Sequence, residues 1–130
     1  MIELTLPIYY TQEYATKPSK TTLLGMNAYR NWHHFTQNKA KIWFSEIVTS
    51  LLPPNPEKFT KFSMVYELFY KSTVCDGSNV IALIEKFTLD SLKANGVIID
   101  DSIKYHLGST WAVIEQDKDN PRVVITIIPA

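Results

Sequence analysis

The stretch Cys75–Asp101 reads CDGSNVIALIEKFTLDSLKANGVIIDD, and the rest of the chain is organised around it. Its apolar residues recur at three- and four-residue intervals, which predicts a helix that follows the loop carrying Asp76 and Asn79. Asn95-Gly96 supplies a left-handed stop for this helix. A short apolar run then ends in Asp100-Asp101. The stretch therefore predicts one helix with acidic side chains beyond both of its ends.

Outside this stretch, hydrophobic alternation and helical periodicity predict the remaining elements. These are a strand over Ile2–Ile8, a polar loop over Tyr9–Gly25, a long helix from an Asn27 N-cap to Leu51, a strand over Phe59–Val74, a strand over Ile103–Leu107 with a bulge at Gly108, and a hairpin of Trp111–Gln116 with Arg122–Ile128. The order β-α-β-α-β-β predicts an α+β fold in which two main helices pack on a mixed β-sheet. Residues 1–130 are expected to form a single domain.

Composition excludes several classes of protein. The single cysteine, Cys75, rules out a disulfide framework and a multi-cysteine zinc site, and we expect it to be buried and structural. No glycine-rich phosphate loop is present. The start of the chain does not resemble a signal peptide, and no apolar run is long enough to span a membrane. We therefore expect a soluble intracellular protein with no membrane partner.

Three polar side chains lie on one line along the predicted helix. Asn79, Lys86 and Asp90 are spaced by seven and then four residues, which places them within about 40° of one another. Asp76 lies just before the helix, and Asp100-Asp101 follows it. If the ends of neighbouring strands lie side by side, these carboxylates converge and supply the oxygen ligands that Mg²⁺ prefers. A nearby lysine would stabilise charge that grows on a phosphate during hydrolysis.

The same residues also have structural interpretations, which the sequence leaves open. Asp76 or Ser78 can be a helix N-cap. A lysine and an aspartate four residues apart can form a surface ion pair, and paired aspartates before a strand can form a turn. Glu85 lies about 100° around the helix from Lys86, and we expect it to be solvent-exposed.

Basic residues are concentrated in the first half of the chain, where residues 1–61 carry a balance of +3 against −3 for residues 62–130. Arg30, Lys39 and Lys41 are interleaved with aromatic residues on the predicted first helix, and Lys17 and Lys20 lie in the predicted loop. Such a pattern suits a surface that follows a phosphate backbone. A solvated helix face around an aromatic core and a mobile surface loop are the alternatives.

The stretch resembles the RusA family of Holliday-junction resolvases, in particular its phage-borne relatives. The resemblance rests on the pattern Asp76…Asn79…Lys86-x-x-x-Asp90-x-Leu92-x-x-x-Gly96-x-x-x-Asp100-Asp101 and on Gly25-Met26-Asn27-x-Tyr29-Arg30-Asn31, and it extends over residues 24–127. It implies a single RusA-like domain that acts as a homodimer. It further implies a hydrolase of DNA recombination and repair that uses Mg²⁺, or Mn²⁺ in its place. This endonuclease would resolve branched DNA by paired incisions in the cytoplasm of a bacterial host that carries the phage.

The resemblance also implies a role for each matching residue. Asp76 matches the first metal-site acid of the family's loop, and Asn79 matches its asparagine, which we expect to contact DNA. Lys86 matches the catalytic lysine and Asp90 the helix acid. Asp101 matches the distal metal-site acid, with Asp100 beside it. Catalysis is thus expected from Lys86, Asp76 and Asp101, and metal binding from the four aspartates.

The sequence departs from the family pattern at two points. Ser78 stands where the loop has its second acid, and Lys86 follows Asn79 by seven residues instead of three, which moves it about 6 Å along the helix. The metal site would then be weaker, use a water at Ser78, or be lost. The alternative function is therefore a RusA-like phage accessory protein that binds DNA or a host protein without cutting.

Overall fold

The computed structural model describes residues 1–130 as three helices and six strands. In chain order the elements are β1 (Ile2–Pro7), β2 (Tyr9–Gln12), β3 (Lys20–Leu23), α1 (Met26–Asn31), α2 (His34–Leu51), β4 (Phe62–Tyr70), α3 (Gly77–Ala94), β5 (His106–Gln116) and β6 (Arg122–Pro129). The predicted α+β class is confirmed, but the predicted order of elements lacks the β2–β3 hairpin and one helix.

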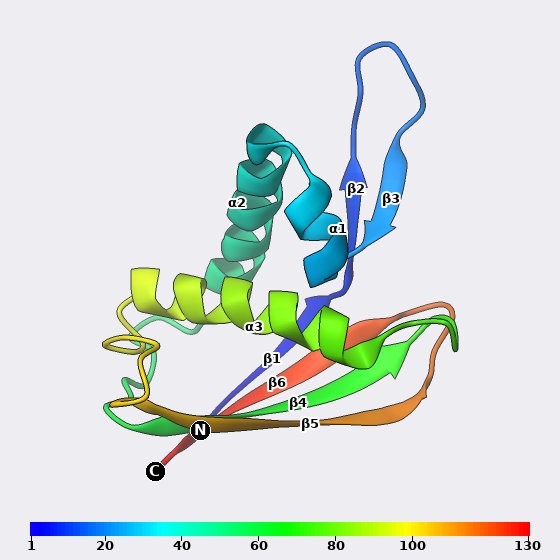
Figure 1. The fold of residues 1–130 in the computed structure, drawn as a ribbon. Coiled ribbons are helices and arrows are strands. Elements are labelled where there is room, and N and C mark those ends of the chain that lie inside the picture. Colours follow the sequence, from blue (N-terminus) through cyan, green and yellow to red (C-terminus); the bar gives the residue numbers. More distant parts are fainter.

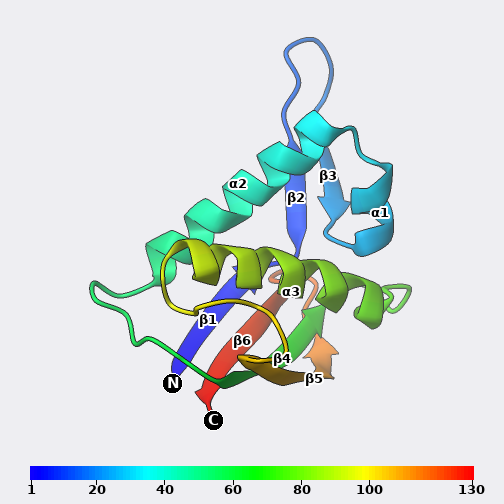
Figure 2. The same ribbon diagram turned by 60° about the vertical axis from the view of Figure 1, so that its left-hand side comes forward.

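Four strands form one mixed sheet in the order β1-β6-β4-β5. β6 is antiparallel to both of its neighbours, whereas β4 and β5 are parallel and are joined by α3. The three helices lie on one face of the sheet, with α3 directly over the strands and α2 above α3 (Figure 1). A second view shows the same two layers, with the opposite face of the sheet free of helices (Figure 2).

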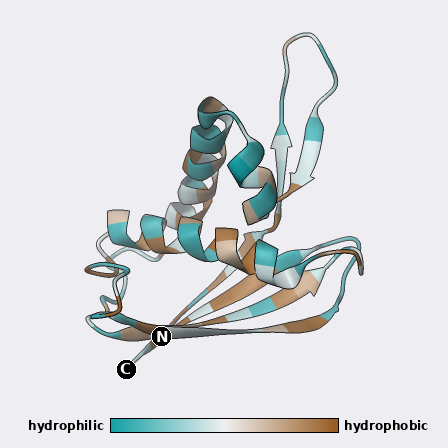
Figure 3. Cartoon of the chain, in the orientation of Figure 1, coloured by the Kyte–Doolittle hydropathy of each residue, from teal (hydrophilic) through white to brown (hydrophobic).

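The core lies between the sheet and α3. Every second residue of β1, β4 and β6 is buried because alternate side chains point to the helix-covered face. Hydrophobic residues accordingly concentrate along these strands (Figure 3). The predicted apolar stripe of α3 is confirmed: its buried members include Val80, Leu83, Ile84 and Phe87. The ring of Phe87 packs against Tyr29 of α1 and Phe44 of α2, with 5.5 Å between centroids in each pair.

The prediction of a loop over Tyr9–Gly25 is wrong, because most of this segment forms the β2–β3 hairpin. Tyr9 is opposite Leu23, and the hydroxyls of Thr11 and Thr21 are hydrogen-bonded at 2.8 Å. Threonine and tyrosine favour extended strands despite their polar groups. The hairpin stands away from the main sheet beside α1 (Figure 1).

The prediction of one helix from Asn27 to Leu51 is also wrong. The backbone is extended at Trp32 and His33, which separates α1 from α2, and the N-caps are Gly25 and His33. The Trp32 ring packs 6.1 Å from that of Tyr10 in the hairpin. The sequence pattern did not predict the hairpin, so it could not predict this contact either.

The predicted pairing of Trp111–Gln116 with Arg122–Ile128 is wrong, because β4 lies between β5 and β6. The connection between them instead crosses the end of β4, where the N–H of Asp117 donates to the carbonyl of Tyr70 at 2.8 Å. The strand predicted at Ile103–Leu107 is mostly wrong, because residues 103–105 form a turn and only His106 and Leu107 belong to the start of β5. The predicted irregularity near Gly108 is confirmed by a register shift that leaves Leu107 as the extra residue.

We predict that Phe87→Ala lowers the free energy of unfolding by about 3–5 kcal/mol, because it opens a cavity among three helices. Urea unfolding followed by tryptophan fluorescence measures the change. Phe35→Ala is the matched control, since Phe35 is 66% exposed, and it should change stability by no more than about 0.5 kcal/mol. Equal unfolding midpoints for the two variants would contradict this packing of Phe87.

Candidate functional site

Asp76 lies at the N-terminal end of α3, where it caps the helix. Its Oδ1 accepts hydrogen bonds from the backbone N–H of Asn79, at 3.3 Å, and from the hydroxyl of Ser78, at 3.0 Å. An acceptor in this position satisfies a helix donor that has no partner within the helix, and its charge suits the helix dipole. The N-cap interpretation of Asp76 is confirmed, and any metal at Asp76 would compete with these bonds.

Asn79 connects the first turns of two helices. Its side-chain oxygen accepts a hydrogen bond from the backbone N–H of Asn27 at 2.8 Å, which fixes α1 against α3. Gly25 packs so closely against the same amide that any side chain at this position would collide with it. Asn79 therefore has a structural role, and the DNA contact proposed for it stays a prediction.

The other three candidate metal acids gather near the C-terminal end of α3, around Lys93. The Lys93 ammonium donates to Asp100 at 2.9 Å. This hydrogen bond raises the pKa of Lys93, and the nearby charges of Asp101 and Asp90 raise it further. The same bond lowers the pKa of Asp100. Asp90 in turn forms an ion pair with Lys41 of α2 at 3.2 Å. Acids and lysines thus alternate across this end of the molecule.

An open groove of about 480 Å³ lies between α2 and α3 beside these charges. Its lining includes Lys41, Asp90 and Lys93, with Phe87 among its apolar members. The hydroxyls of Ser45 and Ser91, which also line it, are hydrogen-bonded to each other at 3.1 Å. The groove therefore offers ammonium and hydroxyl donors together, which are the groups that bind phosphate oxygens.

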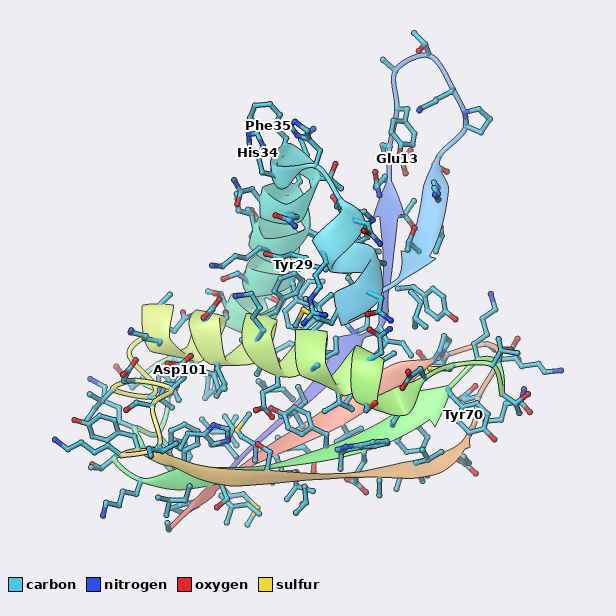
Figure 4. All side chains as sticks on the ribbon, in the orientation of Figure 1. Glu13, Tyr29, His34, Phe35, Tyr70 and Asp101 are labelled. Carbon is cyan, nitrogen blue, oxygen red and sulfur yellow. The ribbon has the colours of Figure 1, made fainter.

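The structure does not bring Asp76 and Asp101 together within one chain. α3 has 18 residues, and a helix of that length separates its two ends by about 27 Å. Asp101 lies beyond the end of α3 that is remote from Tyr70 and the start of the helix (Figure 4). Nowhere in the chain do three His, Cys, Asp or Glu side chains converge closely enough to hold a metal ion.

Lys86 lies on the exposed side of α3, between the two groups of acids. It is ten residues after Asp76, which corresponds to about 15 Å along the helix axis. The i, i+4 ion pair that the sequence allowed with Asp90 does not form, because Asp90 pairs with Lys41 on another helix. Lys86 has no ion-pair partner in the chain.

The candidate DNA-binding cations are spread over three elements. Lys17 and Lys20 belong to the hairpin region, where the Lys17 ammonium lies 4.3 Å above the Tyr14 ring. Arg30 is exposed on α1. On α2, Lys39 lines a groove against the hairpin, whereas Lys41 faces α3. The break at Trp32–His33 places Arg30 and Lys41, which the sequence predicted on one helix, on two different helices.

Sequence reasoning missed a polar cluster between α3 and β5. Glu85 is half-buried beside the hydroxyl of Tyr66, so the expectation that it is solvent-exposed is wrong. Burial, and then the Glu85 charge, raise the pKa of Tyr66. The Tyr66 hydroxyl has no hydrogen-bond partner of good geometry, although Ser109 also lies beside it. Ser109 is instead hydrogen-bonded to His106 at 2.7 Å.

Lys93 is the charged residue that sequence reasoning passed over. Its place in the last turn of α3, three residues after Asp90 and seven before Asp100, was a usable signal. Cys75 is half-buried and not fully buried as expected. Burial, together with the charge of Asp76, raises the pKa of its thiol, which makes it a poor nucleophile.

The chain matches no family model, and no curated protein matches its sequence. None of its helices is long and apolar enough to cross a membrane. A relationship to the RusA family therefore rests on the residue pattern of α3 and its flanks, and it is a proposal.

We predict that Asp76→Ala lowers the free energy of unfolding by about 1 kcal/mol, because α3 loses its N-cap. Asp76→Asn should lower the free energy of unfolding by only about 0.3 kcal/mol, since asparagine caps helices as well as aspartate does. Chemical denaturation of the metal-free protein measures both. If the two variants lose the same free energy of unfolding, the N-cap prediction is wrong, and the charge of the Asp76 carboxylate stabilises this end of α3 instead of its capping hydrogen bond.

We also predict that Lys93→Ala raises the pKa of Asp100 toward its ordinary value, because the hydrogen bond that favours the carboxylate is lost. Carbon-detected NMR titration of the carboxyl groups measures this shift. Since the folded-state pKa of Asp100 is depressed, the stabilisation from this pair is present at neutral pH and is lost as the pH falls through that pKa. Lys86→Ala, which removes an unpaired lysine of the same helix, should leave the titration of Asp100 unchanged.

Proposed function

We propose that this protein is a Mg²⁺-dependent endonuclease of the RusA type that cuts branched DNA and acts as a homodimer. The observation that carries the proposal is an open groove lined by Asp90 and Lys93, with Asp100 hydrogen-bonded to Lys93 and the charge of Asp101 nearby. Carboxylates and lysines next to a groove of phosphate-binding character are the groups that phosphodiester hydrolysis requires. The cytoplasm of a phage-carrying bacterial host is the matching location.

The residues of a single chain do not fit a divalent-metal site, because no three acids converge. A site that includes Asp76 must therefore combine the Asp76 end of α3 from one copy with the Asp100–Asp101 end from another. Two copies related by a two-fold axis would form two such sites. That number suits a four-way junction, in which two strands are cut in a symmetric pair of incisions.

Within this proposal each residue has a distinct task. Asp76 and Asp101 would hold the ion, with Asp90 and Asp100 assisting. When bound, Mg²⁺ would provide an activated water and neutralise phosphate charge. Lys86, which is exposed and has no ion-pair partner, stabilises the charge that develops on the phosphate. Binding of the DNA backbone is assigned to the remaining candidate residues: Lys17, Lys20, Arg30, Lys39, Lys41 and Asn79.

One observation favours a second function. Asp76 already caps α3 and holds the Ser78 hydroxyl, and Ser78 stands where a further acid would be needed. Lys93 also places its own positive charge among the acids at the far end of the helix. A RusA-like protein that binds DNA or a host protein without cutting would have this arrangement, and it would bind neither Mg²⁺ nor Mn²⁺.

We predict that the wild-type protein cleaves a synthetic four-way junction in the presence of Mg²⁺, and that Asp76→Asn, Asp101→Asn and Lys86→Ala each reduce the cleavage rate at least 100-fold. A gel assay with labelled junction strands measures the rate. Asp76→Asn is informative because the N-cap is retained, so lost activity reflects the lost carboxylate and not a frayed helix.

Asp119→Asn and Lys58→Ala are the matched controls, because they remove equivalent charges from exposed positions that are not among the candidate site residues. Both should cleave at the wild-type rate. If the wild type does not cleave and calorimetry detects no affinity for Mg²⁺ or Mn²⁺, the endonuclease proposal is wrong and the non-cutting function takes its place.

A further inference from the structure

The carboxyl ends of β4 and β5 lie side by side at one end of the main sheet. These strands are parallel neighbours joined by α3, so the loops that follow them emerge at the same end (Figure 1). Tyr70, the last residue of β4, marks this end in Figure 4. Where parallel strands are joined by a helical crossover, ligands bind in the crevice outside their carboxyl ends. Two cavities occupy this position, and none of the candidate endonuclease residues lines either of them.

The first of these, the apolar cavity, has a volume of about 200 Å³ and is lined by residues of β4, β5 and the start of α3. Leu68 and Val113 are opposite each other in the ladder, and both line it together with Tyr70. Gly77 brings α3 close to the sheet here, because any side chain at this position would collide with the Trp111 ring. Sites for drug-sized ligands have volumes of about 300–1,000 Å³. The apolar cavity is smaller, so it suits a single ring system.

The second, the basic cavity, has a volume of about 470 Å³. It is lined by Tyr9, Lys71, Ser72, Thr73, Gln116 and Lys118. No acid is among these residues, and neither lysine takes part in an ion pair within the chain. The Lys71 ammonium lies 5.5 Å from the centre of the Tyr9 ring. The Gln116 amide donates to the carbonyl of Lys71 at 2.9 Å, which joins the ends of β4 and β5. The basic cavity therefore offers ammonium and hydroxyl donors to an anion.

The two cavities adjoin each other. Ser72 and Thr73 line both of them. Cys75 lines the apolar cavity and Tyr9 the basic one, and the two side chains are close: burial, and then the charge of the Cys75 thiolate, raise the pKa of Tyr9. Asp76, although next to Cys75, lines neither cavity, because its carboxylate accepts the capping bond from Asn79 instead. Apolar and cationic surfaces thus meet without an acid between them.

We propose that the two cavities form one binding site for a nucleoside monophosphate. The base occupies the apolar cavity beside Tyr70, since aromatic side chains stack on any base. The sugar lies over Ser72 and Thr73, and the phosphate lies in the basic cavity. Two ammonium groups and three hydroxyls line the basic cavity. A phosphate monoester, with three terminal oxygens and close to two negative charges, suits these donors better than a carboxylate with two oxygens and one charge.

We predict that at least one of AMP, GMP, CMP and UMP binds saturably in isothermal titration calorimetry, and that the double variant Lys71→Ala/Lys118→Ala weakens this binding at least about tenfold. The double variant Lys58→Ala/Lys61→Ala is the matched control. It removes the same charge from exposed positions before the start of β4, roughly 30 Å from the site, and it should bind like the wild type. No saturable binding at millimolar nucleotide, or an equal loss in both double variants, would overturn the proposal.

A second comparison tests the apolar cavity. Inorganic phosphate uses only the basic cavity, so it should bind more weakly than the nucleotide. Val113→Phe fills the apolar cavity and should reduce the affinity for the nucleotide to that for inorganic phosphate, while circular dichroism checks the fold. Leu107→Phe is the matched control, because Leu107 is at the other end of β5 and both residues are 53% exposed. If inorganic phosphate binds the wild type as tightly as the nucleotides do, the proposal is wrong.

The 5′-phosphorylated end of a nucleic-acid strand carries the same chemistry as a free nucleotide. A short single strand with a 5′-phosphate, compared with the same strand bearing a 5′-hydroxyl, separates the two sources. If the free nucleotide binds more tightly than either strand, it is the ligand. If the phosphorylated strand binds as tightly and the hydroxyl form does not, the strand end is the source and the site stands. Equal binding of the two strands and of the free nucleotide would overturn the proposal, because the 5′-phosphate would then not be recognised. None of these results depends on junction cleavage, so this site and the endonuclease fail separately.

Discussion

The burial of α3 between the sheet and α2 is the constraint on which the rest of the structure depends. β4 and β5 are parallel neighbours, and parallel strands need a long crossover to return the chain to the starting end. α3 is that crossover, and its apolar side fills the space above the sheet. Its length fixes the separation of everything attached to its ends. The candidate acids are thus distributed by the geometry of the core and not by the needs of a metal ion.

Local signals in the sequence were sufficient for α3 and insufficient for pairing between distant segments. Its apolar stripe, the N-cap at Asp76 and the left-handed stop at Gly96 follow from residues within a few positions of one another. The hairpin, the break at Trp32–His33 and the separation of β5 from β6 depend on contacts between remote parts of the chain. A pattern of alternation predicts that a strand exists, but it contains little information about which strand lies beside it.

In the candidate site, too, contacts that are local in sequence could be predicted and contacts between distant segments could not. The capping role of Asp76 was foreseeable because its hydrogen bonds lie within three residues. The partners of Asp90 and Asp100 were not, because Lys86 and Lys93 both lie within about one helical turn of Asp90, and sequence spacing alone does not choose between them and a lysine on another helix. The structure instead selects Lys41 from α2 and Lys93 from the last turn of α3. Electrostatic pairing across helices depends on how the helices pack, and local sequence spacing does not specify that packing.

Asn79 joins the N-terminal end of α3 to the N-terminal end of α1. Its backbone N–H donates to Asp76, while its side chain holds the first residues of α1, which follow directly from the hairpin. Any event that draws Asp76 away from its helix also loosens the residue that anchors α1. Asp76, Asn79 and Asn27 thus form one chain of hydrogen bonds that joins the N-cap of α3 to the start of α1, beside the projecting hairpin.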